Sequence, residues 1–196
     1  MKLLLLGATG RTGKELLEQA LERGHYVTAL VRSPEKIADR MEVDVRVGSV
    51  MDAAAVEDAV HDRDAVVSTL GVRSARDLIR ADLMTKTMSA LVPAMARRGV
   101  RRLIVLSAVG VGGTVRQAPV MVRIAFRTML RPDARDKAAA EAYVRQSGLD
   151  WTFVYPPMLT KGALTTSYRV GEDLCLSGMP KISRADVAHF MLAQLA

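Results

Sequence analysis

The N-terminal stretch constrains the fold of this chain more than any other part of the sequence. An apolar run from Leu3 to Leu6 stops at Gly7, and a helix-forming segment begins about three residues later. The free N–H groups of a first helical turn face an anion, with the positive end of the helix dipole behind them. Gly10 allows the backbone to approach a phosphate, and Gly13 allows the helix to pack closely on the strand. This order of strand, tight turn and helix therefore predicts a parallel strand that leads into a pyrophosphate-binding loop.

A triplet of glycines is a weak signal by itself. An ordinary strand-to-helix turn that needs a positive φ also uses glycine, and the spacing Gly-x-x-Gly-x-x-Gly is one residue longer than the dinucleotide-binding fingerprint. The apolar strand before the loop, the helix after it and its position at the start of the sequence favour nucleotide binding.

Strands and helices alternate along most of the sequence. Apolar or alternating runs predict strands at residues 3–6, 25–31, 43–47, 65–70, 102–107 and 151–155. Helical spacing and capping residues predict helices at residues 14–23, 52–60, 75–98, 134–148 and from Ser183 onward, and Ser33, as N-cap, and Pro34 open a short helix. The alternation predicts an α/β fold of the Rossmann type, a doubly wound and mainly parallel sheet with helices on both faces. We expect residues 1–196 to form a single domain, with a small loop-rich cap around residues 111–132 and 160–180.

The composition limits the kinds of molecule that this protein is expected to bind. The net charge of +7 suits nucleic acid or an anionic cofactor, but only 4% of the residues are aromatic and no basic stretch is interleaved with stacking rings. We therefore expect no nucleic-acid partner. No apolar run approaches the length of a membrane span, and the histidines have no metal-ligand spacing, so we expect neither a membrane segment nor a metal. The single cysteine, Cys175, cannot form an internal disulfide, which favours a cytoplasmic location and a buried structural thiol.

The predicted fold also indicates where a ligand lies, because ligands of doubly wound sheets bind at the carboxyl ends of the strands. That rule selects the loops at residues 7–13, 32–36, 49–52, 69–73, 107–113 and 155–159. The second strand ends at Arg32, with Lys36 one helical turn further on. An acidic residue at this place holds the ribose hydroxyls of NAD, whereas a cation pairs with the 2′-phosphate of NADP. Solvated surface charges are the alternative interpretation, but the position favours NADP(H) as the cofactor.

Candidate catalytic residues lie after the fifth strand. Dehydrogenases of the short-chain type use a Tyr-x-x-x-Lys pair, in which the lysine lowers the pKa of the tyrosine, and none of the four tyrosines here is followed by lysine at that spacing. Lys137 lies early on the next helix, as a catalytic group or as an ordinary helix-surface lysine. Ser107 ends the strand, and its hydroxyl either bonds a nicotinamide amide or a substrate oxygen, or belongs to a turn. Ser107 and Lys137 are therefore the catalytic candidates.

Five stretches carry a family resemblance. They are Gly7-Ala8-Thr9-Gly10-Arg11-Thr12-Gly13, Leu30-Val31-Arg32-Ser33-Pro34-Glu35-Lys36, Val66-Val67-Ser68-Thr69-Leu70-Gly71, Ser147-Gly148-Leu149-Asp150-Trp151-Thr152 and Ile182-Ser183-Arg184-Ala185-Asp186-Val187-Ala188. Together they resemble the atypical short-chain dehydrogenase/reductase group. Within that group the chain is similar to the NAD(P)H-binding, nitrogen-repression-regulator-like branch that includes biliverdin-IXβ/flavin reductase. The resemblance covers nearly the whole chain, and its motifs specify fold and cofactor more than substrate.

The resemblance implies a role for each part of the cofactor site. Beyond the turn at Gly7, it implies that Thr9, Gly10, Arg11 and Thr12 contact the pyrophosphate, Arg32 and Lys36 the 2′-phosphate, Ser49 and Val50 the adenine, and Leu70 and Gly71 the ribose. In flavin reductase-like members a Pro-Pro-His segment lines the nicotinamide side. Here that segment is Pro156-Pro157-Met158, preceded by Tyr155. Because Met158 cannot donate a proton, the resemblance leaves solvent to supply it.

The segment from Val111 to Pro132 has no counterpart in a minimal fold of this type. Arg123, Arg127 and Arg131 recur every four residues, so on one helix they share a face. One interpretation is a flap over the site, in which Arg123 and Arg127 attract an anionic substrate, and another is a surface helix with a solvated face. Exposed methionines and apolar residues in this segment would instead indicate a partner-binding surface.

The sequence thus predicts an NADPH-dependent oxidoreductase that transfers hydride to a planar conjugated acceptor, such as a flavin, a quinone or a biliverdin-like compound. The alternative is a non-catalytic NADP(H)-binding redox sensor or regulatory protein, which the missing Tyr-x-x-x-Lys pair and Met158 favour. A nucleotide-sugar epimerase is disfavoured, because such an enzyme needs the tyrosine base and a larger substrate domain. We expect a small-molecule acceptor as the partner, and a monomer or weak homo-oligomer.

Overall fold

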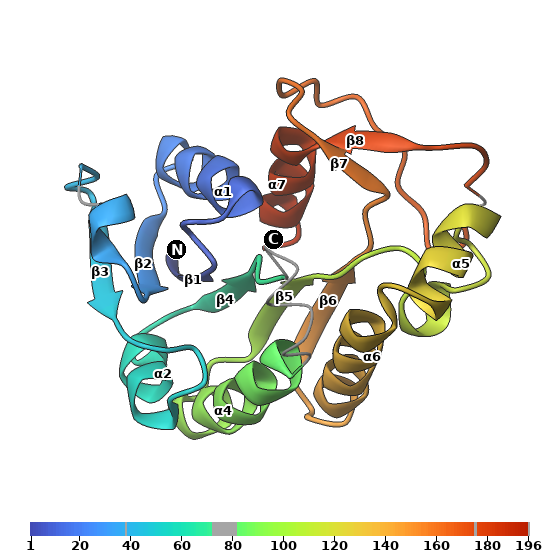
Figure 1. The fold of residues 1–196 in the computed structure, drawn as a ribbon. Helices are drawn as coiled ribbons and strands as arrows, with labels where there is room; N and C mark the ends of the chain where they lie inside the picture. The colour runs from blue at the N-terminus through green and yellow to red at the C-terminus, as the bar shows by residue number, and fades with distance from the viewer. Residues whose placement is uncertain (38, 72–81, 175, 196) are drawn as a thin grey trace.

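A computed structural model describes residues 1–37, 39–71, 82–174 and 176–195. Within them, a central sheet of six strands has the order β3-β2-β1-β4-β5-β6, and every neighbouring pair is parallel (Figure 1). The strands are β1 (Lys2–Leu6), β2 (Tyr26–Val31), β3 (Val43–Val47), β4 (Ala65–Ser68), β5 (Arg102–Leu106) and β6 (Asp150–Val154). The strand order reverses between β1 and β4. The predicted Rossmann-type sheet is therefore confirmed, and its switch point lies beside the glycine loop.

Helices cover both faces of this sheet because alternate leucines of β1 point to opposite sides. Leu3 and Leu5 pack in one core with α1 (Arg11–Glu22) and α7 (Arg184–Ala193). Leu4 and Leu6 pack in a second core with α2 (Ala53–Val60), α4 (Leu83–Arg98) and α6 (Arg131–Arg145). Figure 1 shows these two groups of helices above and below the sheet. A strand that is apolar on both faces is the pattern expected of a buried parallel sheet.

The predicted helix starts are right where a side chain caps the backbone. The Asp52 carboxylate accepts a hydrogen bond from Ala54 N at 3.0 Å, and Ser183 Oγ accepts one from Asp186 N at 2.9 Å. The short helix after Ser33 is only a 3₁₀ turn, η1 (Pro34–Lys36), and the Ser33 side chain makes no capping hydrogen bond. The capping role predicted for Ser33 is therefore wrong.

The outer part of the chain contains structure that the sequence did not predict. Two short strands, β7 (Met158–Thr160) and β8 (Lys181–Ser183), pair in parallel as a separate sheet. Between them the described residues form no helix or strand, and that they act as a cap stays a prediction. The other part of the cap holds the 3₁₀ turn η2 (Gly112–Thr114) and the helix α5 (Val120–Arg127).

Two expectations concern residues that the structure does not describe. Of the helix predicted at residues 75–98, the structure has α4 (Leu83–Arg98), and the prediction for residues 75–81 lies outside the described residues, as does that for Cys175. No helix in the described ranges has the length and apolar character needed to cross a membrane.

Candidate functional site

The glycine loop joins β1 to α1 through a tight, closely packed turn. Gly7 adopts φ +88°, a conformation that favours glycine, and its carbonyl accepts a hydrogen bond from Gly10 N at 2.8 Å. A Cβ on Gly13 would lie 2.1 Å from Gly7 O, so the close packing predicted for Gly13 is confirmed. Thr69 Oγ1 bonds the carbonyls of Leu6 and Gly7 at 3.2 and 3.3 Å. The first N–H groups of α1 therefore emerge at a rigid loop, without intrahelical acceptors.

The strand register brings the predicted loops to one edge of the sheet. Leu6 at the end of β1 lies beside Leu30 of β2 and Ser68 of β4, and Val31 lies beside Val47 of β3. The strands therefore end level with one another, and the loops that follow them adjoin. The predicted cofactor residues at this edge are Gly7, Thr9, Gly10, Arg11, Thr12, Arg32, Lys36, Ser49, Val50, Leu70, Gly71, Ser107, Tyr155, Pro156, Pro157 and Met158.

Positive charge gathers at this edge. Arg32 and Lys36 are exposed, and neither forms an ion pair with a carboxylate among the described residues. Arg184 at the start of α7 lies close enough to Arg11 that the two charges repel. Burial, with this repulsion, lowers the pKa of the Arg184 guanidinium. An anion between these groups would relieve the repulsion, so they fit a pyrophosphate. The sequence reasoning missed Arg184, because it lies far from the loop along the chain.

Ser107 leads into a buried hydrogen-bond network. Its Oγ donates to Glu141 Oε1 at 2.7 Å, and Tyr155 Oη donates to Glu141 Oε2 at 2.9 Å. Arg145 Nη2 donates to Tyr155 Oη at 3.3 Å, and the guanidinium lies over the ring of Trp151. Burial and then the charge of Glu141 raise the pKa of the Tyr155 phenol, which therefore stays protonated. The sequence reasoning missed the role of Glu141, although its i+4 spacing from Lys137 placed both on one face of the helix.

Lys137 is neither an ordinary surface lysine nor a free ammonium group. Its Nζ lies 2.8 Å from Asp133 Oδ2, and the two side chains are only 12% and 8% exposed. Together with Ser107 and Glu141, it borders a packing gap too small for a water molecule, which is also surrounded by Met84, Met88, Val105, Ala140 and Phe153. The structure thus brings the two catalytic candidates together, and Lys137 keeps its partner on its own helix.

The arginine repeat does not lie on one helix, which corrects the prediction. Arg123 and Arg127 belong to α5, but that helix ends at Arg127, and Arg131 begins α6. The break follows from Pro132, which is tolerated in a first helical turn but would remove a hydrogen bond inside a continuous helix. Val120, Met121, Ile124 and Met129 are 50–74% exposed. These exposed methionines and apolar residues are the pattern that indicates a partner-binding surface.

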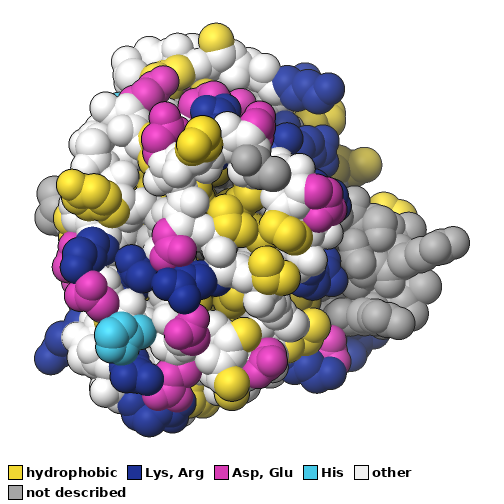
Figure 2. Space-filling model, turned by 90° about the vertical axis from the view of Figure 1, so that its left-hand side faces the viewer, with side chains coloured by type: hydrophobic (Ala, Val, Ile, Leu, Met, Phe, Trp, Pro, Cys, Tyr) yellow, Lys and Arg dark blue, Asp and Glu magenta, His cyan; other side chains and the backbone are white. Residues whose placement is uncertain are grey.

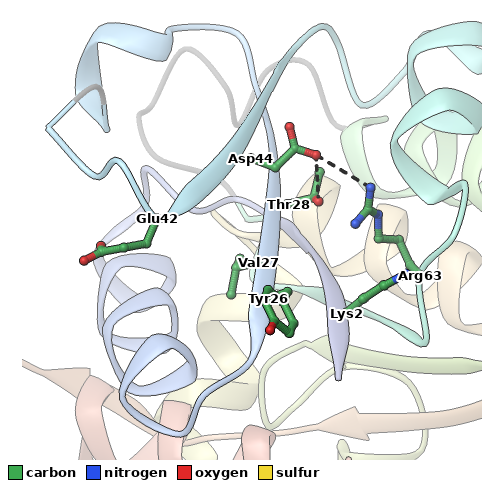
Figure 3. Close-up of a pocket in the computed structure, with 7 residues that line it drawn as sticks. All are labelled: Lys2, Tyr26, Val27, Thr28, Glu42, Asp44 and Arg63. Carbon is green, nitrogen blue, oxygen red and sulfur yellow. Dashed lines mark hydrogen bonds and ion pairs between the residues drawn. The ribbon is translucent and has the colours of Figure 1, made fainter.

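Another hollow, of about 270 Å³, lies at the opposite ends of the strands (Figure 3). Lys2 and Tyr26 begin their strands there, and Asp44 accepts a hydrogen bond from Thr28 Oγ1 at 3.2 Å and pairs with Arg63 at 3.6 Å. On the face shown in Figure 2, basic and acidic side chains are interspersed. Because ligands of this fold bind at the carboxyl ends, and because the charges of Asp44 and Arg63 satisfy each other, this hollow is not the candidate site.

Comparison with known proteins agrees with this geometry. A family model described as NAD(P)H-binding matches residues 7–196. The uncharacterised protein YwnB of Bacillus subtilis is 29% identical over 206 residues, which cover 100% of this chain and 92% of that protein. A (4-alkanoyl-5-oxo-2,5-dihydrofuran-3-yl)methyl phosphate reductase of Streptomyces griseus is 30% identical over 169 residues, covering 83% of this chain and 50% of the reductase.

Among solved structures, ChuY, an anaerobillin reductase from Escherichia coli O157:H7, has a TM-score of 0.81 at 25% identity. The alignment covers 98% of this chain and 89% of the ChuY chain. With the parallel sheet and the glycine loop at its switch point, the family match shows that this protein belongs to the NAD(P)H-binding family.

Proposed function

We propose that this protein is an NADPH-dependent reductase that transfers hydride to a planar conjugated acceptor, such as a flavin, a quinone or a biliverdin-like tetrapyrrole. The observation that carries the proposal is the meeting of the packed glycine loop with the exposed Arg32 and Lys36 at one edge of the sheet. The likeness to ChuY, an anaerobillin reductase, supports a conjugated acceptor.

In this proposal each loop holds one part of the cofactor. Thr9, Gly10, Arg11 and Thr12 surround the pyrophosphate at the start of α1, and Arg184 adds a further positive charge. Arg32 and Lys36 pair with the 2′-phosphate, Ser49 and Val50 lie at the adenine, and Leu70 and Gly71 lie at the ribose. Ser107, Tyr155, Pro156, Pro157 and Met158 border the nicotinamide. When bound, NADPH supplies the hydride, and the protein supplies its position and excludes other geometries.

The described side chains near the nicotinamide place limits on proton transfer. Burial and the charge of Glu141 raise the pKa of the Tyr155 phenol, and its hydrogen is donated to Glu141, so Tyr155 is a weak proton donor for the reduced acceptor. Met158 has no transferable proton. Of the two catalytic candidates, Ser107 donates its hydrogen to Glu141, and the Lys137 ammonium is bound to Asp133. Solvent therefore supplies the proton, which suits acceptors that take it at an accessible ring nitrogen or oxygen.

The test is oxidation of NADPH in the presence of FMN, dichlorophenolindophenol or biliverdin, followed by absorbance at the NADPH band. We expect turnover with at least one of these acceptors, and slower turnover with NADH. Tight NADPH binding without turnover of any acceptor would contradict the catalytic proposal.

The second candidate function is a non-catalytic redox sensor that binds NADP(H) and a protein partner. The exposed apolar residues of α5 and the segment after it favour it, because an unpartnered apolar surface of this kind is where a protein partner binds. A pull-down whose yield depends on the NADP/NADPH ratio, in the absence of turnover, supports the sensor. A yield that is insensitive to the ratio argues against it.

A further inference from the structure

The buried Glu141 carboxylate determines what kind of hydrogen bond Ser107 offers to a ligand. Glu141 is 4% exposed, and each of its oxygens accepts one O–H group, from Ser107 at 2.7 Å and from Tyr155 at 2.9 Å. A serine hydroxyl has a single hydrogen and two lone pairs. Because that hydrogen is donated to Glu141, the Ser107 oxygen has only lone pairs left for the site.

Three contacts fix the direction in which the Ser107 hydroxyl hydrogen points. Arg145 donates to the Tyr155 oxygen at 3.3 Å, which leaves the phenol hydrogen directed to Glu141. The loop after β5 closes over the carboxylate at Gly112, where φ is +54° and a Cβ would lie 2.6 Å from Glu141 Oε2. The backbone of Ser107 is held by a hydrogen bond from its N–H to Val154 O at 2.8 Å. The direction of the Ser107 hydrogen is therefore set by the protein and not by the ligand.

We propose that Glu141 is a positioning residue that makes Ser107 a hydrogen-bond acceptor for the carboxamide N–H of the nicotinamide. This inference rests on the proposed function. Ser107 directly follows β5 at the carboxyl edge, where the nicotinamide end of the cofactor is proposed to lie. The carboxamide NH₂ is the one hydrogen-bond donor of the nicotinamide ring. A carbonyl or an oxyanion of the hydride acceptor offers only lone pairs, and so does the Ser107 oxygen. The two cannot form a hydrogen bond, so Ser107 does not polarise the hydride acceptor.

The consequence for the reaction is geometric. The carboxamide is attached beside C4, the carbon that carries the hydride. Holding the carboxamide through Ser107 fixes the rotation of the ring about its bond to the ribose, and thereby selects the face of C4 that meets the acceptor. Glu141 acts through Ser107 and does not touch the reacting atoms.

The test compares binding of NADP⁺ with that of its 3-acetylpyridine analogue, in which a methyl group replaces the carboxamide NH₂. Titration calorimetry gives both dissociation constants without any turnover. One hydrogen bond corresponds to about tenfold in affinity, so the wild-type protein should bind NADP⁺ about ten times more tightly than the analogue. In Ser107→Ala the ratio of the two dissociation constants should fall to about one, because the variant lacks the oxygen that accepts the hydrogen bond from the carboxamide N–H.

Glu141→Gln is the decisive variant, since it changes little in size and leaves Ser107 in place. Its amide can donate to Ser107, so the serine hydrogen is released into the site and the ratio should again fall toward one. Glu42→Gln, an exposed change before β3 at the opposite end of the sheet, is the matched control and should keep the wild-type ratio. Melting temperatures of all variants show that each is folded, and the ratio is insensitive to a general loss of affinity.

The inference is overturned if the wild-type protein binds both dinucleotides equally, or if Ser107→Ala or Glu141→Gln keeps the tenfold ratio. Those outcomes leave the proposed function standing as long as NADPH is still oxidised. Absence of any binding of NADP⁺ or NADPH to the wild-type protein overturns both.

Discussion

At the scale of single residues, the carboxyl edge of the sheet, where we propose that the cofactor binds, depends on a missing side chain as well as on charged and buried ones. Gly13 lies in the first turn of α1, where any side chain would meet the backbone of Gly7. Arg32 and Lys36 extend from the end of β2 without a carboxylate partner among the described residues, and Tyr155 is buried against the charge of Glu141. Each of these features gives a separate prediction.

Gly13→Ala should destabilise the protein by about 1–3 kcal/mol, because an added Cβ at 2.1 Å from Gly7 O forces the loop and the helix apart. It should also weaken NADPH binding. Gly113→Ala is the matched control, since a Cβ there meets nothing within 4 Å. Chemical denaturation measures both variants, and equal stability of the two would contradict the packing described for the glycine loop.

Arg32→Glu should weaken binding of NADPH by about ten- to a hundredfold, because a charge-assisted hydrogen bond to the 2′-phosphate is replaced by repulsion. Binding of NADH, which lacks that phosphate, should change little. Arg101→Glu makes the same charge change before β5, at the far end of the sheet, and controls for the field of the whole protein. Equal losses for both dinucleotides would refute the assignment of Arg32.

The raised pKa of Tyr155 predicts that the folded protein loses stability at alkaline pH. Its pKa is raised in the folded protein, so between about pH 10, where a free tyrosine titrates, and the higher folded value, the unfolded chain releases a proton that the folded one retains. Stability contributed by the neutral phenol is therefore complete below about pH 10 and decreases as the pH rises above it. Denaturation from pH 8 upward should show a shallower decline for Tyr155→Phe than for the wild-type protein. Parallel curves would contradict the assignment.

At the scale of elements, the first N–H groups of a helix are hydrogen-bonded by side chains of other elements as well as by the helix's own capping residue. The residue before α4, Asp82, makes no capping hydrogen bond. Asp136 of α6 accepts from Met84 N at 2.8 Å and from Thr85 N at 2.9 Å in its place. Likewise, Asp186 of α7 accepts from the N–H groups of Thr165 and Thr166, which anchors the long loop to that helix. Contacts of this kind join elements that are distant in sequence.

Asp136→Ala should therefore cost about 1–3 kcal/mol of stability, because it leaves one buried and one partly buried N–H group of α4 without acceptors. Asp82→Ala removes an exposed ion pair with Lys86 and should cost less than about 1 kcal/mol. Urea denaturation of the two variants gives the comparison. A larger loss in Asp82→Ala than in Asp136→Ala would contradict the capping of α4 by Asp136.

At the scale of the whole molecule, binding and folding are linked, because the cofactor edge exists only in the folded sheet. NADPH at a hundred times its dissociation constant should stabilise the protein by about 2.7 kcal/mol. For a chain of this size that corresponds to a rise in melting temperature of roughly 5–10 °C. Calorimetry or thermal fluorescence measures it, and NADH at the same concentration should give a smaller rise. Equal shifts would contradict the preference for NADPH.

The sheet was predictable because its strands are short runs of apolar or alternating residues, as in β1 and β3, and because predicted helices lie between them in the sequence. The glycine loop, the caps at Asp52 and Ser183 and the edge of the sheet where we propose that the cofactor binds follow from local patterns of that kind. Glu141 and Asp136 were not identified, because helical spacing gives the face of a residue but not the group that it meets across the fold. The β7–β8 pair joins segments of three residues that are separated by about twenty others, and no local pattern marks such a pairing.

The pairing of β7 with β8 has a consequence for how proteins of this kind diversify. Met158 lies beside Lys181, so the chain departs and returns at almost the same point, and the segment in between forms a closed excursion. Its length and composition can change through insertion, deletion or exchange while the six-stranded sheet keeps its register. Variation in this segment would therefore leave the six-stranded sheet, and the glycine loop at its switch point, unchanged.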